Sequence, residues 1–161
     1  MSGPRAAQRL VRLLRLKPHP EGGFYRETYR AAGRIPGRRS PGGRSFCTAI
    51  LFLLLRGGVS RLHRIKSDEL WHFHAGGPLL VVELDPKTGR ARRTELGGRR
   101  VQHVVKAGTW FGAALAPGAG YALVGCTVAP GFEFRDLELG DRTRLLRRYP
   151  KARKLIAHLL P

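Results

Sequence analysis

Short apolar segments, separated by turns that contain glycine or proline, follow one another through the middle of the chain. Runs of this kind, rich in leucine, valine and isoleucine, are typical of strands buried in a sandwich. The segments that we expect to be strands are 45–55, 60–65, 69–75, 79–85, 91–96, 101–106, 109–115 and 121–129. Many short strands with turns between them indicate an all-β sandwich or barrel.

Both ends of the chain have helical periodicity instead. In residues 4–16, Leu10, Leu13 and Leu14 fall on one side of a helix and arginines on the other. We expect a packed first helix; an arginine-rich mitochondrial presequence is the alternative, because no acidic residue precedes Glu21. At the other end, Asp141 is placed to cap a helix, and apolar residues at helical spacing continue to residue 160.

These patterns predict a single domain over residues 1–161. We divide it into an N-terminal helix at 1–17, a basic flexible loop at 31–44, a β-core at 45–139 and C-terminal helices at 141–160. No apolar run is long enough to cross a membrane, so we expect no membrane partner. Cys47 and Cys126 lie in apolar strand patterns and are expected to be buried free thiols, which suits an intracellular, cytoplasmic protein.

The charge of the chain is unusual, because 30 lysines and arginines face 11 acidic residues and give a formal net charge of +19. Such a balance makes nucleic acid a candidate partner. Four arginines of the 31–44 loop could contact phosphates: Arg34, Arg38, Arg39 and Arg44. The loop has no interleaved aromatic residues on which bases could stack, and arginines are spread over the whole chain. A nucleic-acid binder with a basic surface therefore remains an alternative.

The most chemically loaded stretch is residues 57–76, a polar segment between two apolar strands. Successive side chains of a strand point to opposite faces, so Glu69 and Trp71 share one face while His72 and His74 share the other. His63 has the parity of Ile65. A histidine and a glutamate facing the same interior form a candidate acid/base or ligand pair.

The segment FYRETYR at 24–30 has the period of a strand. Either Tyr25 or Arg26 reaches the mouth of a pocket, or the segment is an edge strand with one solvated face. The sequence leaves both readings open.

Three long motifs resemble a known family: HPEGGFYRETYR at 19–30, LHRIKSDELWHFHAG at 62–76 and VGCTVAPGFEF at 124–134. They are similar to a family of small single-domain cupins of unknown function. The first cupin motif is matched by Gly57, His63, Glu69 and Gly76. Ile65 stands where that motif has its second histidine, and Phe111 stands where the second cupin motif has its histidine.

The resemblance implies a double-stranded β-helix, the cupin jelly roll, which pairs as a homodimer. Cupin metals usually take three histidines and one glutamate, of which this chain matches only two. We therefore expect no cofactor, with a divalent metal held by His63, Glu69 and His74 as the alternative.

Some cupins, the deoxysugar-nucleotide epimerases, work without metal through a histidine base and a tyrosine acid. By that likeness His63 is the base, Tyr25 or Tyr121 the acid, and Glu69 the partner of the histidine. We expect these to act on a small polar or sugar-like metabolite. A non-catalytic small-molecule binder is the alternative. Residues expected to contact the ligand are Arg26, Trp71, Phe73, Trp110, Phe111 and Phe132.

Overall fold

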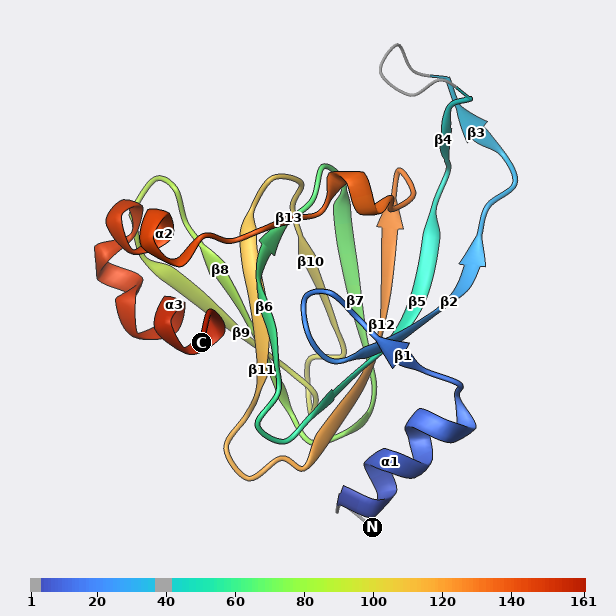
Figure 1. The fold of residues 1–161 in the computed structure, drawn as a ribbon, viewed down its shortest axis with the longest axis horizontal. Coiled ribbons are helices and arrows are strands. Elements are labelled where there is room, and N and C mark those ends of the chain that lie inside the picture. The colour runs from blue at the N-terminus through green and yellow to red at the C-terminus, as the bar shows by residue number, and fades with distance from the viewer. Residues whose placement is uncertain (1–3, 37–41) are drawn as a thin grey trace.

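The fold is a sandwich of two antiparallel β-sheets with a helix at its N-terminal end and helices at its C-terminal end (Figure 1). The structure is a computed structural model that describes residues 4–36 and 42–161. One sheet has the strand order β1 (Lys17–Pro18), β2 (Phe24–Arg30), β5 (Thr48–Leu55), β12 (Tyr121–Ala129), β7 (Asp68–Gly76) and β10 (Gln102–Val105). The other has the order β13 (Glu138–Leu139), β6 (Val59–Arg64), β11 (Trp110–Leu115), β8 (Leu79–Leu84) and β9 (Ala91–Leu96). The predicted all-β jelly roll with helices at both ends is confirmed.

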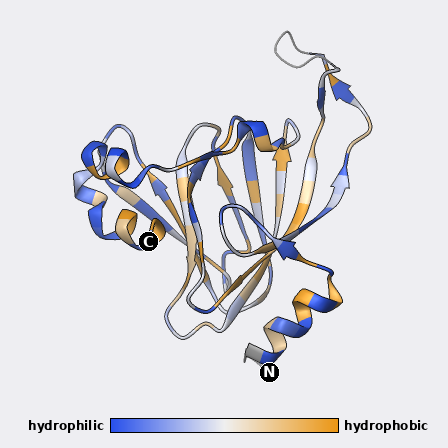
Figure 2. Ribbon diagram, viewed as in Figure 1, coloured by the Kyte–Doolittle hydropathy of each residue, from blue (hydrophilic) through white to orange (hydrophobic). Residues whose placement is uncertain are grey.

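The main core fills the space between the two sheets. Its largest fully buried side chains include Phe52, Trp71 and Phe111, each no more than 1% exposed. Because strand side chains alternate, the neighbours of these residues point to the outer faces of the sheets. In Figure 2 apolar and polar residues are interspersed along the strands.

The outer face of the second sheet is covered by α2 (Arg142–Arg148), η2 (Pro150–Ala152) and α3 (Arg153–Leu159). Leu145, Ile156 and Leu159 from these helices are almost completely buried against the sheet. Asp141 caps α2, because its side chain accepts a hydrogen bond from the backbone N–H of Arg144 at 2.6 Å. The cap predicted from the sequence is confirmed.

The N-terminal helix α1 (Pro4–Leu13) lies against the outer face of the first sheet. Its partly buried Leu10 and Val11 pack against a small cluster that contains Leu53 and Leu123. The helix ends earlier than the apolar pattern suggested, because Arg15 takes a positive φ of 51°. Its packing agrees with the expectation of a packed first helix.

The basic segment 31–44 differs from the loop that we expected. It contains two short strands, β3 (Arg34–Ile35) and β4 (Arg44–Ser45), which pair with each other and project beyond the sandwich (Figure 1). Arg38 and Arg39 lie outside the described residues.

Two further expectations concern the whole chain. Cys47 and Cys126 are free thiols, as predicted; Cys126 is buried, but Cys47 is only half-buried, so that part of the prediction is wrong for Cys47. In the described residues no helix has both the length and the apolar character needed to span a membrane.

Candidate functional site

A cavity of about 550 Å³ opens between the two sheets at the end of the sandwich where β2, β5, β6, β7 and β12 meet. Its buried inner residues include Glu21, His63, Glu69 and Cys126. Its outer residues are charged and aromatic: Lys17, Glu27, Arg30, Glu133 and Phe134. The cavity therefore has ionisable groups at its buried end and a mixed, amphipathic mouth.

Glu21 reaches the cavity because the turn between β1 and β2 folds inward onto β6. The carbonyl of Glu21 accepts a hydrogen bond from the Arg61 N–H at 2.7 Å, and the Gly22 N–H donates to the His19 carbonyl at 3.0 Å. Gly22 has φ of +106°, and a Cβ there would lie 2.2 Å from the Val59 carbonyl oxygen. Only glycine fits this close approach between the turn and β6.

The carboxyl group of Glu21 joins two side chains of β6. Its Oε2 lies 3.1 Å from Nε2 of His63, and its Oε1 accepts a hydrogen bond from the Ser60 hydroxyl at 2.9 Å. Nδ1 of His63 lies 2.6 Å from the Arg61 carbonyl oxygen, to which it must donate. The tautomer that results leaves the Nε2 lone pair facing Glu21. Ser60 and His63 are each no more than 1% exposed.

Burial sets the protonation of this group of side chains. It raises the pKa of Glu21 to about 8, although the hydrogen bond from Ser60 acts in the opposite direction. Burial also lowers the pKa of His63, against the opposing effects of Glu69 and of the Arg61 carbonyl. At neutral pH Glu21 thus carries its proton and donates it to a neutral His63, so their contact is a hydrogen bond between neutral groups rather than an ion pair.

Glu69 is a second buried carboxyl group with an altered affinity for protons. Burial and the neighbouring Glu21 raise its pKa to about 7, while His63, Cys126 and Trp71 oppose the rise. Nε1 of Trp71 has no partner within hydrogen-bonding distance among the described residues, so Trp71 opposes the rise in the pKa of Glu69 less than His63 and Cys126 do. The two carboxyl groups are coupled, because ionisation of either one disfavours ionisation of the other.

His19 completes the ionisable part of the cavity. Its Nδ1 lies 3.3 Å from the Glu21 backbone N, which donates to it, and 3.6 Å from the Glu21 carboxyl group. Burial, followed by the proximity of His63, lowers the pKa of His19 to about 4. His19 is therefore neutral at physiological pH.

One wall of the cavity is aromatic. His19 meets Tyr25 edge to face at 4.5 Å between ring centroids, and Phe134 lies 5.7 Å from His19 and 5.1 Å from Phe132. Phe134 is 50% exposed, so part of its ring is free to meet a ligand. The wall offers apolar ring surface beside the ionisable end.

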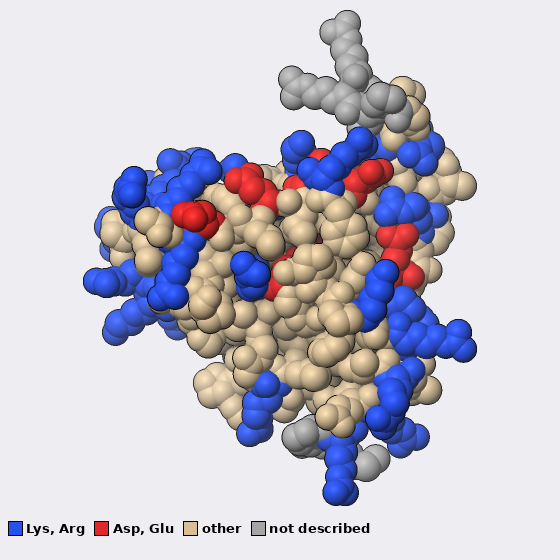
Figure 3. Space-filling model, viewed as in Figure 1, with Lys and Arg blue, Asp and Glu red and all other residues tan. Residues whose placement is uncertain are grey.

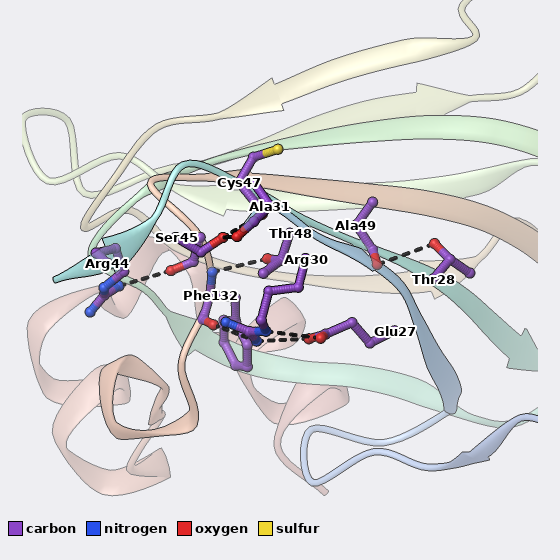
Figure 4. Close-up of polar contacts among 11 residues, drawn as sticks. Glu27, Thr28, Arg30, Ala31, Arg44, Ser45, Cys47, Thr48, Ala49 and Phe132 are labelled. Carbon is purple, nitrogen blue, oxygen red and sulfur yellow. Dashed lines mark hydrogen bonds and ion pairs between the residues drawn. The ribbon is translucent and has the colours of Figure 1, made fainter. Parts of the chain in front are cut away.

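The loop that carries Phe132 is held to the strands of the first sheet (Figure 4). Thr48 Oγ1 accepts a hydrogen bond from the Phe132 N–H at 2.9 Å, and Arg30 donates to the Phe132 carbonyl at 3.1 Å. The same guanidinium binds both carboxylate oxygens of Glu27, at 2.9 and 2.8 Å. These contacts fix the position of the aromatic wall relative to β2 and β5.

The structure brings four of the sequence-predicted site residues to the cavity: His63, Glu69, Tyr25 and Phe132. Trp71 and Phe111 lie in the core, where the ring of Phe111 contacts that of His63 in a tilted arrangement, with 4.2 Å between the centroids.

The other five predicted residues lie away from the cavity lining. Tyr121 is at the far end of β12, about 23 Å along the strand from Val128, which lines the cavity. Trp110 faces the C-terminal helices. Phe73 packs at the edge of the core, and Arg26 is half-buried on β2. His74 is exposed beside Gly125, on the opposite face of β7 from Glu69 and Trp71.

Sequence reasoning missed the residues of the β1–β2 turn, above all Glu21 and His19. By its composition this segment is typical of a turn, which gives no sign that its side chains point into the sandwich. The unusual combination of a histidine, a glutamate and two glycines was the available signal, and it falls in one of the three family motifs.

The donor set does not fit a metal of the usual cupin kind. The two positions that lack a cupin ligand are Ile65, which lines the cavity, and Phe111, whose ring packs against His63. Nε2 of His63 is engaged with Glu21. Among residues 4–36 and 42–161 there is no group of three or more His, Cys, Asp or Glu side chains arranged to hold a metal ion.

Comparison with solved structures shows two relatives of nearly the same length. A hypothetical protein from Leishmania major is 35% identical with a TM-score of 0.85, and the match covers 95% of this chain and 97% of that one. A protein from Shewanella oneidensis is 38% identical with a TM-score of 0.86, over 95% and 96% of the two chains.

A more distant likeness shows the fold alone. Oxalate decarboxylase from Bacillus subtilis is 17% identical with a TM-score of 0.57, and the match covers 88% of this chain but 36% of that one. Its Mn(II) centres belong to that protein. Among curated proteins, none matches the chain at a significant level.

The cupin fold is one that carries small-molecule binding or enzymatic function in general. The model of the family described as "Cupin superfamily (DUF985)" matches residues 8–140. With the two relatives above, this match covers most of the chain, and the protein belongs to that cupin family.

Proposed function

We propose that the protein is an enzyme that isomerises or epimerises a small polar, sugar-like metabolite by acid/base chemistry in the cavity. The observation that supports this most is the presence of two buried carboxyl groups whose pKa values, about 8 for Glu21 and about 7 for Glu69, lie close to neutrality. Proton transfer is most effective when the pKa of the catalytic group lies near the working pH.

The roles differ from those suggested by the epimerase likeness. Nε2 of His63 is already in contact with Glu21, so His63 is better suited to accept and return the proton of Glu21 than to remove a proton from the substrate. Glu69, which is about half ionised near pH 7, is the better base. Tyr25 lines the cavity and contributes ring surface beside these groups.

The chemistry then balances without a cofactor. The Glu69 carboxylate removes a proton from a carbon next to a carbonyl group, while Glu21 donates its proton to the carbonyl oxygen. In isomerisation the enediol that forms takes the proton from Glu69 on the neighbouring carbon, while its other hydroxyl group returns a proton to Glu21 and becomes the new carbonyl group. In epimerisation the enediol turns over in the cavity, Glu69 returns its proton to the opposite face of the first carbon, and the oxygen returns its proton to Glu21. Between these two steps the Glu21 carboxylate keeps the hydrogen bond that it accepts from the Ser60 hydroxyl.

The free-energy cost of burying Glu21 and Glu69 also favours a functional role for them over a role in stabilising the fold. Burying carboxyl groups against a pKa rise of this size costs free energy that an apolar core would not. Perturbed ionisable groups in a cavity are characteristic of functional sites.

The test is exchange with solvent. The protein would be incubated in D₂O with a panel of aldoses, ketoses, sugar phosphates and sugar nucleotides, and deuterium incorporation at carbon would be followed by NMR. The proposal requires exchange into at least one class of compound, and its loss in Glu69→Gln and Glu21→Gln. The matched control is Glu95→Gln, since Glu95 is exposed on β9.

A non-catalytic binder is the second candidate, favoured by the aromatic wall of Tyr25, Phe132 and Phe134. It predicts that members of the panel raise the melting temperature without any exchange. Phe134→Ala would then weaken binding while Glu69→Gln would not.

A homodimer is part of the proposal. β1 pairs with β2 only at Phe24 and Tyr25, so the rest of that edge has no neighbouring strand among the described residues. Sedimentation velocity would show a dimer, and a monomer at all concentrations would contradict it.

A further inference from the structure

We propose that a groove between β9 and the C-terminal helices binds the phosphodiester backbone of a nucleic acid. The groove lies on the outer side of the second sheet, away from the cavity, and is independent of the function proposed for that cavity. It has a volume of about 830 Å³ and is bounded by the start of β9 on one side and by η2 and the first residues of α3 on the other.

Among the residues that the structure describes, the lining of this groove carries five basic side chains and no acidic one. They are Arg90, Arg93, Lys151, Arg153 and Lys154. None of the five makes an ion pair within the described part of the chain, although the acids Asp68 and Glu138 elsewhere on the surface are paired. Holding five like charges around one concavity is unfavourable unless an anion occupies it.

The packing of β9 and α3 brings these basic side chains together. Ala91 of β9 and Leu155 of α3 are partly buried against the cluster beneath the helices, and Ala152 is 4% exposed. These anchors hold the strand and the helix in fixed relation, and the basic residues beside them extend from either side of the gap. Figure 3 shows lysine and arginine side chains gathered over the C-terminal helices.

The positive surface continues beyond the groove along α2. A second, smaller hollow there is lined by Arg144, Arg147 and Arg148. Its single acid, Asp141, is already used as the cap of α2. A run of cations on neighbouring helices fits a polymer of phosphates better than one small anion.

The lining also indicates how the polymer is contacted. One arginine guanidinium group can donate two parallel hydrogen bonds to the oxygens of a phosphate, and three of the five basic residues are arginines. None of the described residues that line the groove is aromatic, so a base has no side chain there on which to stack. The contacts therefore go to the backbone and do not read sequence.

A membrane surface is the other polyanion to consider, and the structure favours it less. The lining is concave, whereas a bilayer is flat. Within residues 4–36 and 42–161, none of the exposed large hydrophobic side chains lines the groove, so the lining offers no side chain that could enter the lipid.

The experiment compares two variants with the same loss of charge. The groove variant replaces Arg90, Arg93, Lys151, Arg153 and Lys154 by glutamine. The control variant replaces five exposed basic residues of other surfaces by glutamine: Arg5, Arg9, Arg12, Arg15 and Arg56. Circular dichroism would check that both are folded. Two half-variants, Arg90/Arg93 and Lys151/Arg153/Lys154, keep the test valid should the full groove variant not fold.

Binding would be measured by fluorescence anisotropy with labelled mixed-sequence duplex DNA and, in parallel, single-stranded RNA. Five phosphate contacts predict a slope of log K against log salt of about −4.5 on duplex DNA, which is about a 500-fold loss of affinity between 50 and 200 mM salt. The groove variant should lose most of this slope, each half-variant part of it, and the control variant little.

Three results would overturn the proposal. An equal loss in the groove and control variants would mean that net charge alone drives binding. Tighter binding to phosphatidylserine vesicles than to either nucleic acid, with the same dependence on the groove, would assign the surface to a membrane. Failure of the wild-type protein to bind either nucleic acid at about 50 mM salt would remove the basis for the site.

Discussion

Glu21→Gln should make the protein more stable at alkaline pH. Because burial raises the pKa of Glu21 from 4.5 to about 8, the unfolded chain releases this proton at a lower pH than the folded protein. The stabilisation is complete below the unfolded pKa and is lost as the pH rises through the folded one. A neutral glutamine cannot ionise, so the variant escapes this loss.

The size of the effect follows from the two pKa values. Between pH 6.5 and 8.0, the Glu21 contribution to the free energy of unfolding should fall by roughly 1.5 kcal/mol. Glu69 should add a fall of roughly 1 kcal/mol, part of which depends on the charge of Glu21. The neutral histidines of the site change in the opposite direction, but they are common to both proteins and cancel in the comparison.

Glutamine is also a close mimic of the protonated side chain. Its carbonyl oxygen can accept the Ser60 hydroxyl and its amide can donate to Nε2 of His63, so little stability should be lost at pH 6.5. Relative to the wild type, Glu21→Gln should therefore gain roughly 1.5 to 2 kcal/mol as the pH is raised to 8.0.

The assay is urea unfolding at pH 6.5, 7.25 and 8.0, followed by tryptophan fluorescence, since Trp71 is completely buried. Glu95→Gln, at an exposed position, should follow the wild type at every pH. If the wild-type stability were flat over this range, or if Glu21→Gln fell in parallel with it, the protonation assigned to the site would be refuted.

Two further predictions concern how the fold holds the two sheets and the turn. His103→Ala should lower the free energy of unfolding by about 1–3 kcal/mol, because it leaves the buried Glu83 with only one of its two partners. The control His158→Ala, at an exposed position, should change the free energy of unfolding by less than about 0.5 kcal/mol. Equal effects of the two substitutions in thermal unfolding would contradict the role given to the His103–Glu83 contact between the sheets. Gly22→Ala should lower the free energy of unfolding by on the order of 2–3 kcal/mol, since the new Cβ meets a carbonyl of β6. Gly89 also has a positive φ but open space around it, so Gly89→Ala should lower it by about 1 kcal/mol. If urea unfolding showed Gly89→Ala to be the more destabilising, the turn would not need its close approach to β6.

The β-architecture could be predicted from the sequence because apolar alternation and turn residues mark each strand locally. Strands β9 and β12 have the bounds that the pattern predicted. Strand parity likewise placed Glu69 on the interior face, and the structure has it buried in the cavity. Such predictions depend only on residues that are neighbours along the chain.

The full site could not be predicted, because its assembly depends on contacts between distant segments. Glu21 enters the cavity only through pairing of its turn with β6, and nothing beside it in the sequence specifies that pairing. The position of Tyr121 depends on distant contacts in the same way, since pairing with β5 directs β12 so that its C-terminal end, and not the end with Tyr121, lies at the cavity. The raised pKa of Glu21 is in turn a consequence of burial, which the sequence does not reveal.

The most direct test of this account is to titrate the glutamate carboxyl groups. Protein labelled with ¹³C at the glutamate side-chain carboxyl carbon would be followed by NMR between pH 4 and 9, with Glu21→Gln and Glu69→Gln used to assign the signals. We expect one carboxyl group to titrate with a pKa of about 8 and one with a pKa of about 7, each absent from the matching variant. Titration of every glutamate in the ordinary range of exposed carboxyl groups would contradict the proposal that the cavity is an acid/base site.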